Sequence, residues 1–267
     1  MLTSPNAAAV QMQCLLGEPE ANLAQAEALL APLAGRVHFA CLPELCTTGY
    51  NLAALGPELE RLAEPVPGPS TERLARLARQ WRMALIFGLA ERDPAGGRPY
   101  DTAVILSANG ELAGRYRKSH LHPAEVACFA PGDELPVFQV DGLRVGVAIC
   151  FEHAFPHIFT TLALRGAQII FNPSAVPVGF GYLQALRSRA RAQDNQLFVV
   201  AANHVGAEGD VVYCGQSQIA DPRGRVVALA PEEGQAAVSA PLALELIGEQ
   251  RRQEPVFAGF RPKLYEP

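Results

Sequence analysis

The chain has 267 residues, of which 49% are hydrophobic and 18% are charged, and its formal net charge is −5. This balance is that of an ordinary globular protein that buries a substantial core. Because acidic and basic residues are spread along the chain rather than gathered in blocks, we expect neither nucleic acid nor a membrane surface as the main partner. The sequence also has no run approaching the ~20 consecutive apolar residues that a membrane-spanning helix needs.

The start of the chain and its cysteines indicate a reducing compartment. Residues 1–13 lack a basic segment followed by a long apolar run, so we expect no secretory signal. The six cysteines, none of them in a Cys-x-x-Cys pair, lie at positions 14, 41, 46, 128, 150 and 214. We therefore predict reduced thiols in a cytoplasmic protein, which leaves a cysteine free to act as a nucleophile.

Predicted strands and helices alternate from the beginning of the chain. Residues 6–13 form a predicted strand, and 20–33 form a predicted helix whose leucines and alanines share one face. The apolar segment VHFACLPE is a strand that ends in a carboxylate at Glu44, and a second helix fits 71–80. Further strands are predicted over 83–90, 101–107 and 112–117.

The last two of these strands are joined by Asn109-Gly110, a dipeptide typical of the tight turn of a β-hairpin. A loop rich in histidine, proline and acidic residues follows over 119–136. Strands and helices then alternate through the segments LRVGVAIC, FPHIFTTLALRG, AQIIFNPS, 181–194 and QLFVVAAN, before a hairpin made by CGQSQIADP and RVVALA. The alternation predicts an α/β protein with mixed sheets and outer helices. Since no linker or change of composition marks a boundary, we expect residues 1–267 to form one domain.

Three polar residues stand at the ends of separate predicted strands: Glu44, Lys118 and Cys150. Strand ends are where α/β sheets tend to present functional groups. Each residue taken alone is more simply explained without a catalytic role. A cysteine after an apolar strand is usually a small core residue, and a charged residue at a strand end is usually solvated. The combination and the flanking residues favour a catalytic site.

The flanking residues resemble the nitrilase superfamily of carbon–nitrogen hydrolases, and in particular its amidase-like branch. The matching motifs run in the family's order over nearly the whole chain: LPELCTTGY, YRKSHL, FAPGD and VGVAICFEHAFP, with supporting matches in FGLAERD, NPSA, RARAQDNQLFVVAAN and GQSQIADPRG. The resemblance implies that Glu44 is the general base, Lys118 the oxyanion stabiliser and Cys150 the attacking thiolate. Glu125 falls where the family carries a second glutamate that positions the substrate.

Elementary chemistry fits these roles. A thiol with an ordinary pKa near ~8.5 needs a base or a cation beside it before it can attack. Glu44 can take that proton and return it to the departing amine. Lys118 and the backbone N–H of Phe151 can face the tetrahedral oxyanion, where one such donor is worth roughly 3–4 kcal/mol of barrier. From the residues alone, a solvated surface position for Glu125 stays open.

Four further residues are predicted to contact the substrate, with ordinary loop packing as the alternative: Tyr50, Phe151, Glu152 and Ser174. The resemblance also implies an α-β-β-α four-layer sandwich of two mixed sheets with outer helices, and a homodimer or a higher homo-oligomer. The helix after the nucleophile, the arginine-rich helix around 184–194 and the tail 250–267 would form the contact. The tail has too little core-forming pattern to pack alone, so we expect it to pack on a partner subunit.

Other motifs give weaker signals. His120 and His122 form a His-x-His pair, but no third ligand lies at a recognisable spacing, so we expect no metal. Cys150 and His153 could form a nucleophile–base pair, although the resemblance assigns the base role to Glu44. The sequence has no Walker A loop, no Gly-x-Ser-x-Gly elbow and no dinucleotide fingerprint, so we expect no cofactor.

The expected reaction is hydrolysis of a small linear amide, such as an N-carbamoyl amine or an ω-amide, through a cysteine thioester with release of ammonia. Nitrile hydrolysis is an alternative, because Phe151-Glu152 after the nucleophile is close to the pattern of the nitrile-cleaving branch. A binding or scaffold protein without turnover is an alternative of another class, which the intact Glu44, Lys118 and Cys150 set argues against. His204 stands where many relatives have arginine, which weakens any carry-over from subgroups that use the arginine.

Overall fold

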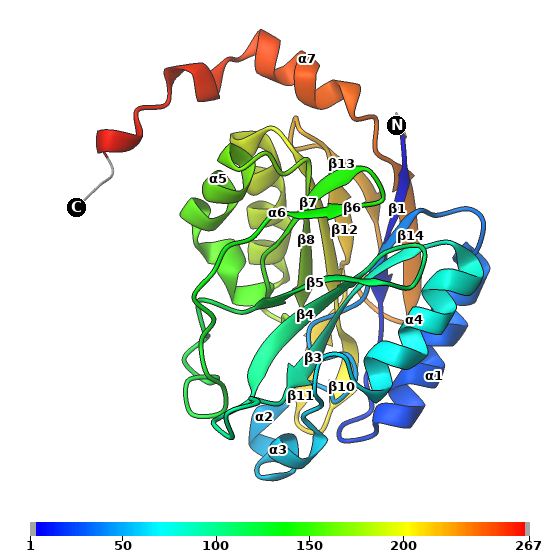
Figure 1. Ribbon diagram of the computed structural model, residues 1–267. Helices are drawn as coiled ribbons and strands as arrows, with labels where there is room; N and C mark the ends of the chain where they lie inside the picture. Colours follow the sequence, from blue (N-terminus) through cyan, green and yellow to red (C-terminus); the bar gives the residue numbers. More distant parts are fainter. Residues whose placement is uncertain (1–3, 265–267) are drawn as a thin grey trace.

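The computed structural model describes residues 4–264 and arranges them as two six-stranded sheets that lie face to face (Figure 1). The first sheet has the order β14 (Ala236–Pro241), β1 (Asn6–Gln11), β2 (Phe39–Cys41), β3 (Ala84–Glu91), β4 (Tyr100–Leu106) and β5 (Leu112–Arg117). The second sheet has the order β13 (Val226–Leu229), β12 (Gln218–Ala220), β9 (Phe198–Asn203), β8 (Ile169–Ser174), β7 (Leu143–Val147) and β6 (Phe138–Val140). Both sheets are mixed, because β1–β2–β3 and β7–β8–β9 run parallel and the outer strands pair antiparallel.

Amphipathic helices cover the outer face of each sheet. Helices α1 (Pro19–Leu30) and α4 (Pro69–Trp81) pack on the first sheet, and α5 (Pro156–Leu164) and α6 (Gly181–Asn195) pack on the second (Figure 1). In α4 the buried residues Leu74, Leu77 and Ala78 recur at helical spacing, and exposed charges occupy the other side. The predicted α-β-β-α sandwich is confirmed. Within residues 4–264, no helix combines the length and the apolar composition needed to cross a bilayer.

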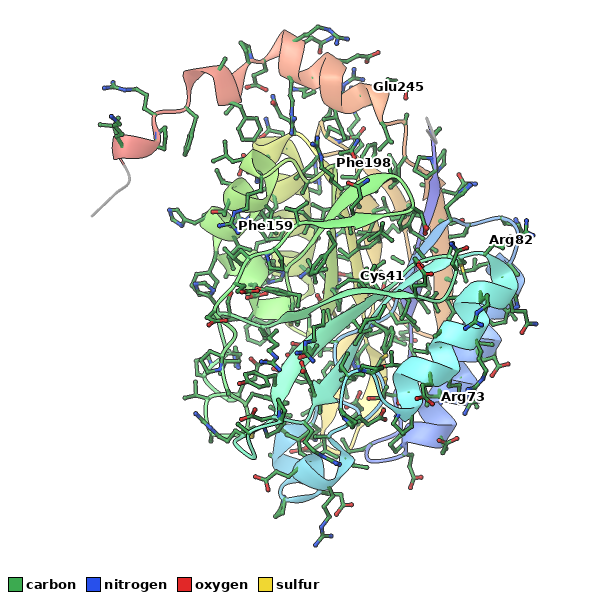
Figure 2. All side chains as sticks on the ribbon, in the orientation of Figure 1. Cys41, Arg73, Arg82, Phe159, Phe198 and Glu245 are labelled. Carbon is green, nitrogen blue, oxygen red and sulfur yellow. The ribbon has the colours of Figure 1, made fainter. Side chains whose placement is uncertain are left out.

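The largest hydrophobic cluster lies between the two sheets. The rings of Phe39 from the first sheet and Phe171 from the second stack with their centroids 6.1 Å apart. Figure 2 shows side chains filling this layer, which includes Cys41 and Phe198, whereas Arg73 lies on the outer helix α4. Burial of each large apolar side chain contributes roughly 1.5–3 kcal/mol. The layer therefore holds the two sheets, and the strand ends that they carry, in a fixed relation.

Shorter elements complete the chain: α2 (Leu52–Leu55), α3 (Glu58–Leu62), β10 (Val205–Glu208), β11 (Val211–Cys214), α7 (Glu245–Gln253) and the 3₁₀ turns η1 (Ala31–Leu33), η2 (Cys150–Ala154), η3 (Val256–Gly259) and η4 (Pro262–Leu264). The hairpin predicted at Asn109-Gly110 joins β4 to β5. The sequence did not predict β14, which pairs with β1, or the β10–β11 hairpin. From α7 onward the chain runs across one end of the sandwich (Figure 1), where Ile247 joins the cluster between the sheets and Phe257 packs against the cluster under α5 and α6. The single domain and the packing of 250–267 on a partner stay predictions, and 265–267 lie outside the described residues.

Candidate active site

The predicted catalytic residues follow strands of both sheets. Glu44 lies beyond β2, Lys118 directly after β5, and Cys150 opens η2 beyond β7. The Lys118 Nζ atom lies 2.5 Å from Glu44 Oε1 and 2.6 Å from Glu125 Oε1, and these three side chains are fully buried. The Cys150 thiol is close enough for the charges of all three to act on it. The fold thus brings the four residues together from distant parts of the sequence.

Close packing between strands fixes the backbone of Glu44. The Gly88 N–H on β3 donates to the Pro43 carbonyl over 3.1 Å, which extends the β2–β3 pairing toward Glu44. A Cβ atom at Gly88 would lie 2.7 Å from the Glu44 Cα atom and 2.4 Å from the Leu45 nitrogen. Only glycine allows this approach.

The two glutamates differ in how their oxygens are satisfied. Glu125 Oε1 accepts hydrogen bonds from Lys118 and the Tyr50 hydroxyl, and Oε2 accepts from the His122 backbone N–H over 2.7 Å. Glu44 Oε1 accepts from Lys118, but its buried Oε2 has no hydrogen-bond partner among the described residues. An oxygen without donors is the better proton acceptor. The geometry therefore distinguishes Glu44, which has one oxygen without a donor, from Glu125, whose two oxygens both accept hydrogen bonds.

A third carboxylate that the sequence analysis missed belongs to this cluster. Asp101, on β4, is fully buried, and its Oδ2 lies 3.3 Å from Lys118 Nζ. The carboxylates of Asp101, Glu44 and Glu125 each place one oxygen within 4.8 Å of the others. Neither oxygen of Asp101 accepts a hydrogen bond from a described residue. Burial raises the pKa of Asp101 to about 6 and raises the pKa of Glu44. The single Lys118 ammonium thus lies among three carboxyl groups, and burial together with their mutual repulsion favours the protonated form of Glu44 and Asp101.

Burial and neighbouring charges set the protonation of the nucleophile and the lysine. Burial opposes the charge on Lys118, but Glu44 and Asp101 outweigh it and raise the pKa of the ammonium. Burial, with the charge of Glu44, raises the pKa of the Cys150 thiol above its ordinary value, against the pull of Lys118. In the resting site the sulfur is therefore a thiol and the lysine a cation. Attack requires removal of the thiol proton.

A cavity of about 630 Å³ reaches Cys150. Two of the predicted substrate contacts, Tyr50 and Phe151, line it. Apolar side chains make up much of the remaining wall, including Leu52, Val176, Phe180 and Leu183. The Glu44, Lys118 and Glu125 side chains are not part of this wall and lie buried beyond it. Of these four residues, only Cys150 is therefore in direct contact with the space that a ligand would occupy.

The two other predicted contacts, Glu152 and Ser174, do not line this cavity. Glu152 is buried, and its oxygens accept from the Ser119 N–H over 2.9 Å and from the Ile149 N–H over 2.7 Å. It therefore joins the segment after β5 to the segment that carries the nucleophile. Ser174 is buried at the end of β8.

His120 and His122 pack against aromatic rings near η2. The ring centroids of His120 and Phe155 are 4.4 Å apart, and those of His122 and Phe151 are 5.0 Å apart. In the part of the chain that the structure describes, neither histidine belongs to a group of three potential metal ligands. The group of Glu44, Asp101 and Glu125 has the right donors for a cation, but the Lys118 ammonium already lies among its oxygens.

His153 is held by an arginine. Its Nε2 lies 3.0 Å from Arg187 Nη1, and burial together with the charges of Arg187 and Arg191 lowers its pKa to about 3. A ring that stays neutral at so low a pH is a poor acceptor for the proton of Cys150. This disfavours the Cys150–His153 pair as the reacting group.

His204 supports the backbone of the proposed base. Its Nε2 lies 2.5 Å from the Glu44 carbonyl oxygen, and its Nδ1 lies 2.5 Å from Glu208 Oε1. Glu208 Oε2 in turn accepts from the Tyr50 backbone N–H over 2.7 Å. His204 and Glu208, together with Cys14, form the second group of three potential metal ligands among the described residues. The hydrogen bonds of His204 and Glu208 link the segment that carries Glu44 to the segment that carries Tyr50.

Comparison with known proteins identifies the family of this chain. Residues 6–252 match the family described as carbon-nitrogen hydrolase. A nitrilase of Pyrococcus abyssi is 35% identical, and the alignment covers 91% of this chain and 91% of the relative. An (R)-stereoselective amidase of a Pseudomonas species is 34% identical over 82% of this chain and 78% of its own. The ω-amidase NIT2 of Homo sapiens is 33% identical over 84% of this chain and 83% of its own.

Solved structures share the fold. Saccharomyces cerevisiae Nit3, a member of branch 10 of the nitrilase superfamily, superposes with a TM-score of 0.87 at 27% identity and covers 95% of both chains. A glutamate-to-glutamine variant of the Nesterenkonia sp. AN1 amidase superposes with a TM-score of 0.80 at 25% identity, covering 93% of this chain and 97% of its own. In that variant acrylamide has added to the active-site cysteine. The chain therefore belongs to the carbon-nitrogen hydrolase family of the nitrilase superfamily.

Proposed function

We propose that this protein is an amidase that cleaves the carbon–nitrogen bond of a small linear amide and releases ammonia. The observation that supports this most directly is the buried Glu44–Lys118–Glu125 cluster beside a thiol at the end of a cavity. Relatives named as amidases and ω-amidases support an amide as the substrate. The substrate carbonyl carbon meets the Cys150 sulfur, with the rest of the molecule in the cavity.

The first step is attack on the amide carbon. Glu44 takes the thiol proton as the sulfur–carbon bond forms, because its Oε2 has no other donor. Negative charge develops on the carbonyl oxygen, where Lys118 stabilises it. The Phe151 N–H lies in the first turn of η2, where backbone donors have no acceptor within the helix, and supplies a second hydrogen bond. Each such donor is worth roughly 3–4 kcal/mol of barrier.

Collapse of the tetrahedral intermediate breaks the carbon–nitrogen bond. Glu44 now gives its proton to the nitrogen, which leaves as ammonia rather than as an amide anion. The raised pKa of Glu44 makes the same carboxyl group a competent acid for this step. The acyl group stays on Cys150 as a thioester.

Water completes the cycle. Glu44 accepts a proton from the water molecule that attacks the thioester, and collapse returns the sulfur and releases the carboxylic acid. Glu125, saturated by Lys118, Tyr50 and a backbone N–H, keeps the lysine in place through both half-reactions. Tyr50 lines the cavity, so it connects Glu125 to the space that the substrate occupies.

The proposal is tested by ammonia release and by mass spectrometry of the thioester. A Cys128→Ser background removes the other cysteine in the described part of the cavity wall, so that any adduct reports on Cys150. We expect acyl transfer to the Cys150 peptide during turnover of a panel of short amides, and no adduct or ammonia after Cys150→Ala. Undiminished ammonia release from the Cys150→Ala protein would refute the mechanism.

The same assay separates the alternatives. Each amide is compared with the nitrile of the same carbon skeleton. We expect more ammonia from the amide, whereas a preference for the nitrile would assign the protein to the nitrile-cleaving branch. A protein that forms no adduct and releases no ammonia from either series would favour the scaffold alternative.

A further inference from the structure

We propose that Arg187 binds a carboxylate at the far end of the substrate, so that the preferred substrates are amides with an anionic group at the other end of the molecule. The proposal rests on the proposed amidase function and adds a substrate class to it. Arg187 lies on α6 and lines the cavity that reaches Cys150. Among the described residues in the cavity wall, it is the only lysine, arginine, aspartate or glutamate.

The Arg187 guanidinium is oriented but not neutralised. Its Nη1 lies 3.0 Å from His153 Nε2, and because arginine only donates, the ring nitrogen must accept. His153 stays neutral near pH 7, since burial and nearby cations lower its pKa to about 3. The histidine therefore fixes the direction of the guanidinium without supplying a negative charge.

Within residues 4–264, no carboxylate lies within ion-pairing distance of Arg187. Arg187 forms no ion pair there, and its bond to His153 is its only hydrogen bond in that part of the chain. Arg191, one turn further along α6, differs because Asp194 lies 3.6 Å from it. The cavity thus contains a half-buried cation whose other N–H donors have no partner among the residues that the structure describes.

The chemistry of these donors selects the ligand. A guanidinium presents its N–H groups in a planar fork that matches the two oxygens of a carboxylate. Apolar residues such as Val176, Phe180 and Leu183 form much of the wall and suit the carbon chain between the two ends of the substrate. Bound this way, the substrate has its amide at Cys150 and its carboxylate at Arg187.

The test compares pairs of substrates. Monoamides of the four-, five- and six-carbon dicarboxylic acids are each paired with the straight-chain amide of the same carbon number, and kcat/KM is measured for both. We expect the wild-type protein to prefer the anionic member of at least one pair. Arg187→Gln should lower that preference ratio by about 10- to 100-fold, as expected for loss of a hydrogen-bonded charged partner.

Two further variants sharpen the result. Arg187→Lys keeps the charge without the fork, so we expect a preference between those of the wild type and Arg187→Gln. This variant also provides a measurement if Arg187→Gln does not fold. Arg189→Gln is the matched control, because Arg189 lies on the same helix, is exposed, is absent from the cavity wall and binds the Gly224 carbonyl. Its preference ratio should equal that of the wild type.

The outcomes separate the two proposals. A wild-type protein that hydrolyses the neutral amides as well as the anionic ones, or a ratio that Arg187→Gln and Arg187→Lys leave unchanged, would overturn the role of Arg187 and leave the amidase function standing. Failure of the wild-type protein to cleave any amide or to form an adduct on Cys150 would overturn the amidase function itself.

Discussion

Replacement of Asp101 by asparagine tests how the buried cluster sets the strength of the base. The substitution keeps the size of the side chain and removes one negative charge 3.3 Å from Lys118 Nζ. The charge of Asp101 raises the pKa of Glu44, after the larger effect of burial. Without that charge, Glu44 should lose its proton at lower pH. The acid limb of the profile of kcat/KM against pH, where protonation of Glu44 stops attack, should therefore move to lower pH.

The size of the shift follows from Coulomb's law. The carboxylate oxygens of Asp101 and Glu44 lie within 4.8 Å of each other. At an effective dielectric constant of about 20, two unit charges at that distance interact by about 3 kcal/mol, which equals about 2 pKa units. Lys118 between the carboxylates compensates part of this, so we expect a displacement of about 1 to 2 pH units. The interaction is fully present only above the Asp101 pKa of about 6, where the aspartate is charged.

The assay is ammonia release from one amide between pH 4 and pH 9, with kcat/KM fitted for the wild type, Asp101→Asn and a control. Asp133→Asn is the control, because Asp133 is exposed in the loop after Lys118. Its acid limb should coincide with that of the wild type. An acid limb of Asp101→Asn that stays in place or moves to higher pH would refute the reasoning, since it would mean that Asp101 does not act on the base.

Two other substitutions probe the same site. Tyr50→Phe removes the hydroxyl that donates to Glu125, and since a hydrogen bond to a charged group is worth roughly 1.5–3 kcal/mol, kcat should fall by about 10- to 100-fold in steady-state assays; an unchanged kcat would show that Lys118 and the backbone hold Glu125 without help. Gly88→Ala would place a methyl group against the backbone of Glu44, so unfolding in urea should show a loss of about 1–3 kcal/mol together with loss of activity. Gly259→Ala is the control, because a Cβ atom at Gly259 would have no atom from elsewhere in the chain within 4 Å, and it should change neither the stability nor the activity. A fully active Gly88→Ala protein would contradict the packing argument.

The sequence predicted the sandwich, and it singled out Glu44, Lys118 and Cys150 as candidate reacting residues, because these signals are local. Strands β8 and β9 are buried along their whole length and each begins with large apolar residues, and the hairpin between β4 and β5 has its Asn-Gly turn. Glu44, Lys118 and Cys150 each follow such a strand within a recognisable motif. The edge strand β14 carried no comparable signal, because its segment AAVSAP has no large apolar residue except Val238 and no alternation of apolar and polar residues.

Two residues of the candidate site, Asp101 and Arg187, lie in no recognisable motif and were identified only from the structure. Asp101 is a single aspartate at the start of a strand, which in a sequence looks like the end of a turn. The register of the hairpin gives its position, because Thr102 pairs with Arg117 and the Lys118 N–H donates to the Asp101 carbonyl over 2.9 Å. Counting back from the predicted turn could therefore have found it. Arg187 was part of a helix assigned to a subunit contact, and only the three-dimensional structure shows that it lines the cavity.

Two of the non-glycine residues with positive φ lie at this site. Leu45, next to the base, has φ of 44°, and Cys150 itself has φ of 42°, a region that costs a residue with a side chain of order 1–3 kcal/mol. Both lie in rigid surroundings: Gly88 packs against the backbone of Glu44, and Glu152 accepts from the N–H that precedes the nucleophile. The strain turns the chain sharply at the end of each strand, so that the sulfur from one sheet faces a carboxylate from the other. The two turns at Leu45 and Cys150 are therefore part of how segments from the two sheets form one site.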